Sequence, residues 1–269
     1  FGNTFVQQSS RNARYLADLI GIDAPVAEGA ALPYGASEYA PSDYVHGPEG
    51  LGDITAIPQI GSNDSRDAAT FLCDMAVAHA GALTICAIGP LTNIADAIKR
   101  DPAFAANVAS LVIMGGAYEH AGNVSPHAEA NIIHDAAAAD VVFASGMNIT
   151  MVGLDATMKT LLTPADFDTL AQKAPRIGGF MKRISDFYLG FYRSVGVTNG
   201  CPMHDALAVL ACTNSEKFTF VRNGIRVAQS GEDIGATLGD TTRPPVKIAM
   251  DCDADWATST MMDRIIELG

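Results

Sequence analysis

The sequence predicts an α/β fold in which a mostly parallel central sheet is flanked by helices, in the Rossmann-like arrangement. Short apolar runs of strand length alternate with helical stretches along most of the 269 residues, a pattern typical of βαβ units. The apolar runs are continuous, as expected for strands that are buried on both faces. Each run ends in a loop of small or polar residues.

The first half of the chain contains three strands of this kind. The run ALTICAI stops at Gly89-Pro90, and the run SLVIM stops at Gly115-Gly116. A helical stretch separates each strand from the next, with apolar residues spaced along one face. In chain order we expect a strand at 82–88, a helix at 91–100, a strand at 110–114, a helix at 136–145 and a strand at 148–154.

The second half continues the plan. A helix is expected after Thr163, with Pro164 in its first turn. It is followed by helices at 177–192 and 205–213, a strand at 246–250 and a closing helix with apolar residues at 261, 262, 265 and 266. The segment 27–65 is rich in Gly, Pro, Ser and Tyr and lacks periodicity, so we expect long loops there. In open α/β sheets ligands bind at the carboxyl ends of the strands, which directs attention to the loops after Ile88, Met114 and Leu154.

Composition excludes several classes of partner. Seventeen Lys and Arg against 30 Asp and Glu give a net charge of −13, which disfavours nucleic acid and anionic membrane surfaces. No apolar run reaches the roughly 18 to 20 residues of a membrane span. The five cysteines are odd in number and never form a CxxC pair, and three lie in apolar runs. This usage predicts a reducing compartment and a cytoplasmic location.

The densest polar cluster, residues 115–131, follows a buried strand. Asn123, Glu129 and Asn131 could converge on a polyhydroxylated ligand, because each sugar hydroxyl seeks both a donor and an acceptor. The alternative is a turn-rich loop in which these side chains bond their own backbone. Composition alone leaves both interpretations open and favours the second.

A second candidate is His204-Asp205, at the start of an apolar helix. Asp205 could cap the helix or take a metal or catalytic role. His204 could protonate a leaving group near neutral pH, although a lone loop histidine is more often a surface residue.

Other candidates have simpler interpretations. The segment 44–53, with His46, is expected to be a Gly-rich loop, and the stripe Tyr188, Phe191 and Tyr192 is more typical of a core than of a ligand site. The remaining histidines have no partner at metal-ligand spacing and are expected to be solvated or locally satisfied: His79, His120, His127 and His134.

Taken together, the motifs resemble the inosine-uridine-preferring nucleoside hydrolases. They occur in the family's order over nearly the full chain, and their conjunction is specific although no single motif is. The matching residues are Asn3, Arg11-Asn12, His46-Gly-x-x-Gly-Leu-Gly, Ile88-Gly-Pro-Leu-Thr-Asn93, Met114-Gly-Gly-Ala, Gly122-Asn123-Val-Ser-Pro-x-Ala-Glu129-x-Asn131, Met151-Val-Gly-Leu-Asp155 and His204-Asp205.

The resemblance implies a single domain over 1–269 of the nucleoside hydrolase type, a bound calcium ion and a homo-oligomer, either dimer or tetramer. It implies hydrolysis of the N-glycosidic bond of ribonucleosides to ribose and free base, as in nucleoside salvage. The family pattern places Asp205 and the backbone carbonyl of Ile88 on calcium, which prefers such hard oxygen ligands. It places five residues around the ribose: Asn3, Met114, Asn123, Glu129 and Asn131.

On the base side, the resemblance makes His204 the general acid facing the leaving base, with His46 as a second histidine. It also places Tyr192 near the base. The position between Glu129 and Asn131 is usually Phe in the family and is Ala130 here, which should widen the pocket over the sugar.

One family motif does not occur in these residues. The family opens with Asp-x-Asp-Pro-Gly-x-Asp-Asp, whose carboxylates bind the metal and deprotonate the attacking water. The acidic run Asp251-Cys-Asp253-Ala-Asp255 lacks the Pro-Gly and fits the family's C-terminal end instead. The likeness therefore implies that an opening β-α-β unit is missing before Phe1.

Two explanations remain. Either the opening unit lies outside the 269 residues, or the natural chain lacks it and cannot build a working calcium site. We favour the first, because losing a central strand would leave unpaired backbone groups in the sheet. The second would make the protein an inactive nucleoside- or ribose-binding homologue. A dinucleotide-binding enzyme is disfavoured, since no GxGxxG follows a strand.

Overall fold

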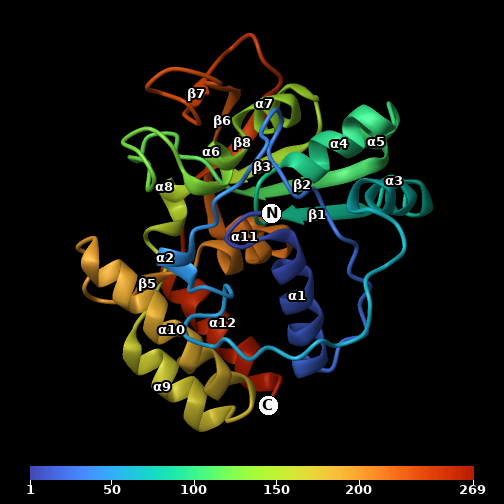
Figure 1. Ribbon diagram of the computed structural model, residues 1–269. Helices are drawn as coiled ribbons and strands as arrows, with labels where there is room; N and C mark the ends of the chain where they lie inside the picture. Colours follow the sequence, from blue (N-terminus) through green and yellow to red (C-terminus); the bar gives the residue numbers. More distant parts are fainter.

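Six strands form the central sheet of the computed structural model, which describes residues 1–269 (Figure 1). Their order is β1-β2-β3-β8-β6-β7, and the three pairings from β1 to β8 are parallel. The prediction of a mostly parallel sheet is confirmed. The strands are β1 (Leu83–Ala87), β2 (Val108–Met114), β3 (Ile149–Val152), β6 (Phe218–Val227), β7 (Thr237–Gly239) and β8 (Pro245–Cys252).

The third strand ends earlier than its apolar run predicts. β3 stops at Val152 because Gly153 packs against the backbone that follows β2: a Cβ at Gly153 would lie 2.5 Å from the carbonyl oxygen of Gly116. The amide of Leu154 then donates to the same oxygen at 2.9 Å, and the chain turns into the short helix α8 (Leu154–Thr157). This turn directs the residues after β3 towards the carboxyl ends of the strands.

The two antiparallel strands β6 and β7 were not predicted from the sequence. β6 pairs antiparallel with β8, from Phe218 opposite Cys252 to Gly224 opposite Pro245, and β7 adds a further antiparallel strand. A separate two-stranded sheet joins β4 (Leu161–Leu162) to β5 (Cys201–Pro202).

Helices cover both faces of the central sheet, and β2 shows this in its side chains. Leu111 and Ile113 pack into the core beneath α3, α4 and α7, whereas Val112 and Met114 pack against α8, α11 and α12. Continuous apolar runs in the sequence thus reflect burial on both sides, as predicted.

A third apolar cluster lies away from the sheet, at the lower part of Figure 1, where α9 and α10 pack together. It includes Phe167, Leu189 and Tyr192. The long loops predicted at 27–65 are confirmed, interrupted only by α2. No helix combines the length and apolar character needed to cross a membrane.

The predicted helices are confirmed to within two residues at each end where bounds were predicted, whereas α1, α2, α3, α5, α6 and α8 were not predicted. The helices are α1 (Val6–Ile20), α2 (Asp43–His46), α3 (Ala68–Ala78), α4 (Thr92–Arg100), α5 (Phe104–Asn107), α6 (Ala130–His134), α7 (Ala136–Ala144), α8 (Leu154–Thr157), α9 (Pro164–Lys173), α10 (Ile177–Ser194), α11 (His204–Thr213), the 3₁₀ turn η1 (Ser215–Lys217) and α12 (Ala254–Glu267).

Candidate active site

A cavity of about 550 Å³ lies at the carboxyl ends of the parallel strands, between the sheet and α10. Its volume is in the range of small-molecule sites. The structure brings all ten residues predicted for the site to its lining: Asn3, His46, Ile88, Met114, Asn123, Glu129, Asn131, Tyr192, His204 and Asp205. They come from seven separate segments, so the fold rather than local sequence assembles the cavity.

Two amides present complementary groups to the cavity. The Nδ2 of Asn131 donates to the carbonyl oxygen and the Sδ of Met114, at 3.0 and 3.2 Å. The Oδ1 of Asn123 accepts the backbone N–H of Ala130 at 3.0 Å. Asn131 therefore keeps a free acceptor and Asn123 keeps a free donor. Part of the turn interpretation is correct, because both side chains also fix the loop.

Glu129 is almost wholly buried, with 2% of its surface exposed. Its carboxylate accepts backbone N–H groups from Gly116 at 2.9 Å, Asn131 at 3.0 Å and Ile132 at 3.2 Å, and so caps α6. Burial raises the pKa of Glu129 to about 7, against the opposing effect of those hydrogen bonds. The residue ties the loop after β2 to α6 as well as lining the cavity.

His204 is held from both sides of its ring. Its Nε2 lies 2.7 Å from the hydroxyl oxygen of Tyr192, and its Nδ1 lies 2.7 Å from Oγ1 of Thr157. Burial, with a smaller contribution from His46, lowers the pKa of His204 to about 4, so the ring is neutral at pH 7. With both nitrogens engaged, His204 has no free N–H to offer a leaving base directly.

Aromatic side chains form another part of the cavity lining. The ring of Tyr188 stacks on His46, and its hydroxyl donates to Tyr192 at 3.4 Å. Phe191 packs edge-on against both Tyr192 and Tyr44. The three residues of this α10 stripe belong to or pack against the third apolar cluster, as expected, and all three also line the cavity. The expected Gly-rich loop is found at 47–53, directly after α2, and His46 at the end of α2 also lines the cavity.

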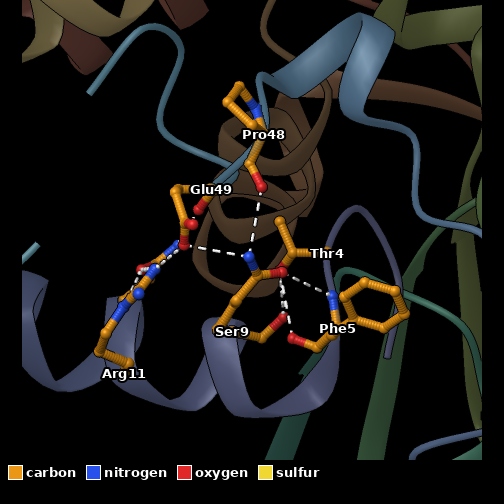
Figure 2. A network of polar contacts seen from close by, with 8 residues as sticks. Thr4, Phe5, Ser9, Arg11, Pro48 and Glu49 are labelled. Atoms are coloured by element: carbon orange, nitrogen blue, oxygen red, sulfur yellow. Dashed lines mark hydrogen bonds and ion pairs between the residues drawn. The ribbon is translucent and has the colours of Figure 1, made fainter. Parts of the chain in front are cut away.

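A polar network holds the loop that follows His46 against α1 (Figure 2). Arg11 Nη2 lies 2.6 Å from a carboxylate oxygen of Glu49, and Gln8 Nε2 donates to the same carboxylate and to the Pro48 carbonyl. This ion pair lowers the pKa of Glu49. At Gly47, φ is +81° and a Cβ would lie 2.0 Å from the Gly52 carbonyl oxygen, so the tight turn requires glycine.

Asp205 faces the cavity at the start of α11 and does not act as its cap, since the N-cap position is Met203. The surrounding walls desolvate the carboxylate although it is open to the cavity, and this raises the pKa of Asp205 to about 6. No cation of the chain offsets that effect. A desolvated carboxylate that opens onto a cavity suits a hard cation such as calcium.

The residues present do not by themselves make a metal site. No three His, Cys, Asp or Glu side chains are grouped so that they could hold a metal ion. Asp205 and the Ile88 carbonyl, which both border the cavity, supply two oxygen donors, whereas calcium takes about six to eight.

The four histidines that were not predicted for the site differ from one another, and one of them, His120, also lines the cavity. His120 contacts the Ala121 carbonyl through Nδ1, and His127 lies 3.5 Å from Asp233, as local satisfaction predicts. His134 does not follow this prediction: its Nδ1 is buried without a partner, because the ring packs edge-on against Tyr39. Thr157 carried no signal in the sequence, and only the fold reveals its contact with His204.

Comparisons with known proteins agree with this geometry. The family model described as inosine-uridine preferring nucleoside hydrolase matches residues 1–258. Uridine nucleosidase 1 of Arabidopsis thaliana is 39% identical over 241 residues, covering 89% of this chain and 72% of that protein. The inosine-uridine preferring nucleoside hydrolase of Leishmania major is 33% identical over 279 residues, covering 100% and 87%. The solved purine-preferring ribonucleoside hydrolase from Gardnerella vaginalis superimposes with a TM-score of 0.95 at 31% identity, covering 100% and 88%.

Proposed function

Because this chain belongs to the inosine-uridine preferring nucleoside hydrolase family, we propose that it hydrolyses the N-glycosidic bond of ribonucleosides to ribose and free base. The reaction class, N-glycosidase, follows from the family. The observation that carries the proposal is the single cavity that joins the amide pair to the Tyr192–His204 pair. A ribonucleoside offers the matching halves, a polyhydroxylated sugar and an aromatic base.

The sugar belongs at the amide side. A ribose hydroxyl can donate to the free Oδ1 of Asn131, and another can accept from the free Nδ2 of Asn123. Met114 holds the Asn131 amide through its carbonyl oxygen, Glu129 accepts the backbone N–H of Asn131, and Asn3 also lines the cavity. These contacts support the assignment of the five residues to the ribose.

The base belongs at the aromatic side. Tyr188, Tyr192 and His46 offer flat faces for an aromatic ring. As the C1′–N bond breaks, its electron pair moves onto the base, and a hydrogen-bond donor there stabilises the developing charge. His204 reaches this position through the Tyr192 hydroxyl. We therefore assign His204 the general-acid role as one member of a pair with Tyr192.

Calcium is the cofactor we propose, within a family that is generally metal-dependent. Asp205 and the Ile88 carbonyl would provide two of its oxygen ligands. The shell is incomplete among the 269 residues, so no step of the reaction is derived through the ion.

Product analysis tests the proposed function. Incubation of the protein with uridine or inosine should release free base, detected by liquid chromatography, together with an equal amount of reducing sugar. The 2′-deoxynucleosides should be cleaved far more slowly, because a deleted hydroxyl leaves its buried amide partner unpaired. Equal rates on both classes would contradict the ribose assignment.

A second function, binding without hydrolysis, is favoured by one observation: the cavity has a single carboxylate free to hold a metal, Asp205. Equilibrium titration with uridine separates the two. Saturable binding with no product after prolonged incubation with calcium would identify a ribonucleoside-binding protein.

The quaternary structure and the location complete the proposal. We propose a homo-oligomer, dimer or tetramer, in the cytoplasm, acting in nucleoside salvage with no nucleic-acid or membrane partner. Light scattering on the eluting protein measures the subunit number, and fractionation of the source cells locates the protein.

A further inference from the structure

We propose that Thr157 is a positioning residue that fixes the tautomer of His204 and thereby makes the Tyr192 hydroxyl a hydrogen-bond donor to the leaving base. The inference rests on the proposed hydrolysis and extends it to a residue outside the cavity lining. It follows from three contacts in a row: Thr157 to His204, His204 to Tyr192, and Tyr188 to Tyr192.

Thr157 lies in a closed environment. It is the last residue of α8, has no exposed surface, and its Oγ1 contacts only Nδ1 of His204, at 2.7 Å. The backbone N–H and C=O of Thr157 have their own partners in Gly153 and Thr160. The hydroxyl hydrogen therefore has one acceptor within reach, the ring nitrogen.

This isolation sets the direction of the bond. If Nδ1 carried the proton and donated it to Oγ1, the Thr157 hydroxyl hydrogen would be buried with no acceptor, which is unfavourable. If instead the hydroxyl donates to Nδ1, every polar group is satisfied. The His204 proton then resides on Nε2.

The direction continues along the chain of contacts. The Nε2–H of His204 donates to the oxygen of Tyr192, which also accepts the Tyr188 hydroxyl hydrogen at 3.4 Å. With its oxygen serving as acceptor twice, Tyr192 has its own hydrogen free for the cavity that it lines. In the opposite tautomer, Nε2 would accept the hydroxyl hydrogen of Tyr192. That hydrogen would then no longer be available to bond the base.

The step balances with the water that hydrolysis consumes: water adds to C1′, and the proton it loses replaces the one that the Tyr192 hydroxyl gives to the base. The electron pair of the breaking C1′–N bond goes to the base, and the Tyr192 hydroxyl stabilises it by a hydrogen bond strengthened by His204. Thr157 touches neither sugar nor base and acts only by holding the imidazole in one form.

Paired variants of Thr157 test the inference. Thr157→Val keeps the shape and removes the hydroxyl, whereas Thr157→Ser keeps the hydroxyl. We expect Thr157→Val to lower kcat for uridine or inosine about 10- to 100-fold with little change in KM, and Thr157→Ser to stay near the wild type. The p-nitrophenyl riboside, whose leaving group needs no hydrogen bond, should be affected less than about threefold by either variant. Parallel loss on both substrates, or an equal loss in Thr157→Ser, would overturn the proposal in favour of a packing role.

Two further measurements complete the test. In a His204→Ala background, adding Thr157→Val should cause no additional loss, whereas an independent, additive loss would contradict the proposal. Nitrogen-15 NMR of histidine-labelled protein, assigned with the His204→Ala spectrum, should show the Nε2–H tautomer of His204 in the wild type and its loss in Thr157→Val. An Nδ1–H tautomer in the wild type overturns the inference. This readout needs no turnover, so it distinguishes failure of the inference from failure of the proposed function.

Discussion

The imidazole of His46 lies against the ring of Tyr188, with ring centroids 5.5 Å apart and planes 27° apart. The two residues come from α2 and α10, which contact each other, and both residues line the cavity. The stack therefore joins the long loop to the helix that carries the aromatic wall.

Replacing Tyr188 should weaken nucleoside binding. Aromatic pairs contribute about 0.5 to 1.5 kcal/mol beyond their buried area, so Tyr188→Leu is expected to raise KM for uridine or inosine up to about tenfold. Tyr188→Phe keeps the stack and loses only the 3.4 Å hydrogen bond, and its KM should stay close to that of the wild type. Steady-state kinetics measures both. Equal KM values in the two variants would show that the stack does not support the base.

The amide pair should matter for turnover and little for folding. Asn123→Ala and Asn131→Ala each remove a partner of a sugar hydroxyl, at a cost of about 1 to 3 kcal/mol. We expect kcat/KM on ribonucleosides to fall about 10- to 100-fold. Thermal denaturation serves as the check on folding, and Asn148→Ala, which loses an amide contact to Ala109 on the exposed surface, is the matched control. If the control variant loses as much activity, the amide pair has no special role in turnover.

Asp205 should control calcium affinity. Asp205→Asn keeps the size of the side chain and removes its charge, so calcium binding measured by isothermal titration after chelation should be lost. Asp251→Asn removes an exposed carboxylate that pairs with Lys159 and should leave calcium binding unchanged. Undiminished affinity in Asp205→Asn would exclude Asp205 from the metal ligands.

Glu129 should make the stability of the fold depend on pH. Burial raises its pKa to about 7, above the value of about 4.3 for a free Glu. Between these pH values the folded state holds a proton that the unfolded state has lost. The contribution of Glu129 to the free energy of unfolding is therefore most favourable below about pH 4.3 and declines as pH rises to about 7.

Denaturant titrations compare this with Glu129→Gln. The amide oxygen can accept the N–H groups of Gly116 and Ile132 but the amide NH2 cannot accept that of Asn131, a loss that does not depend on pH because the amide cannot ionise. The stability of the variant relative to the wild type should therefore increase from about pH 4.5 to pH 7.5. A constant difference across that range would show that the pKa of Glu129 is not raised.

The parallel core of the fold was predictable because its strands are continuous apolar runs. Residues 110–114 could be assigned from SLVIM alone, since both faces of β2 are buried. β6 was missed because its sequence pattern is mixed: Arg222 and Arg226 are exposed, and Gly224 interrupts the run of side chains typical of a strand. Its antiparallel place beside β8 depends on contacts that only the tertiary structure supplies.

The site was predictable where residue type and chemistry coincide. Asn123 and Asn131 stand in a polar loop after a buried strand, and His204 and Asp205 are adjacent. Thr157 could not be predicted in this way, because a threonine in a short helix has many ordinary roles. The residue that it contacts also lies 47 residues further along the chain. The sequence also could not show which polar atom of each amide is free. That follows only from the structure, in which the other polar atom of each amide is already hydrogen-bonded.

Residues from distant parts of the chain line the cavity, among them Asn3, His46, Asn131 and Asp205 on α11. A molecule bound there contacts segments that separate when the chain unfolds, so binding and unfolding are thermodynamically linked. A ligand at one hundred times its dissociation constant would add about 2.7 kcal/mol to the free energy of unfolding. Nucleosides can consequently be ranked by the melting temperature they confer, whether or not they are cleaved.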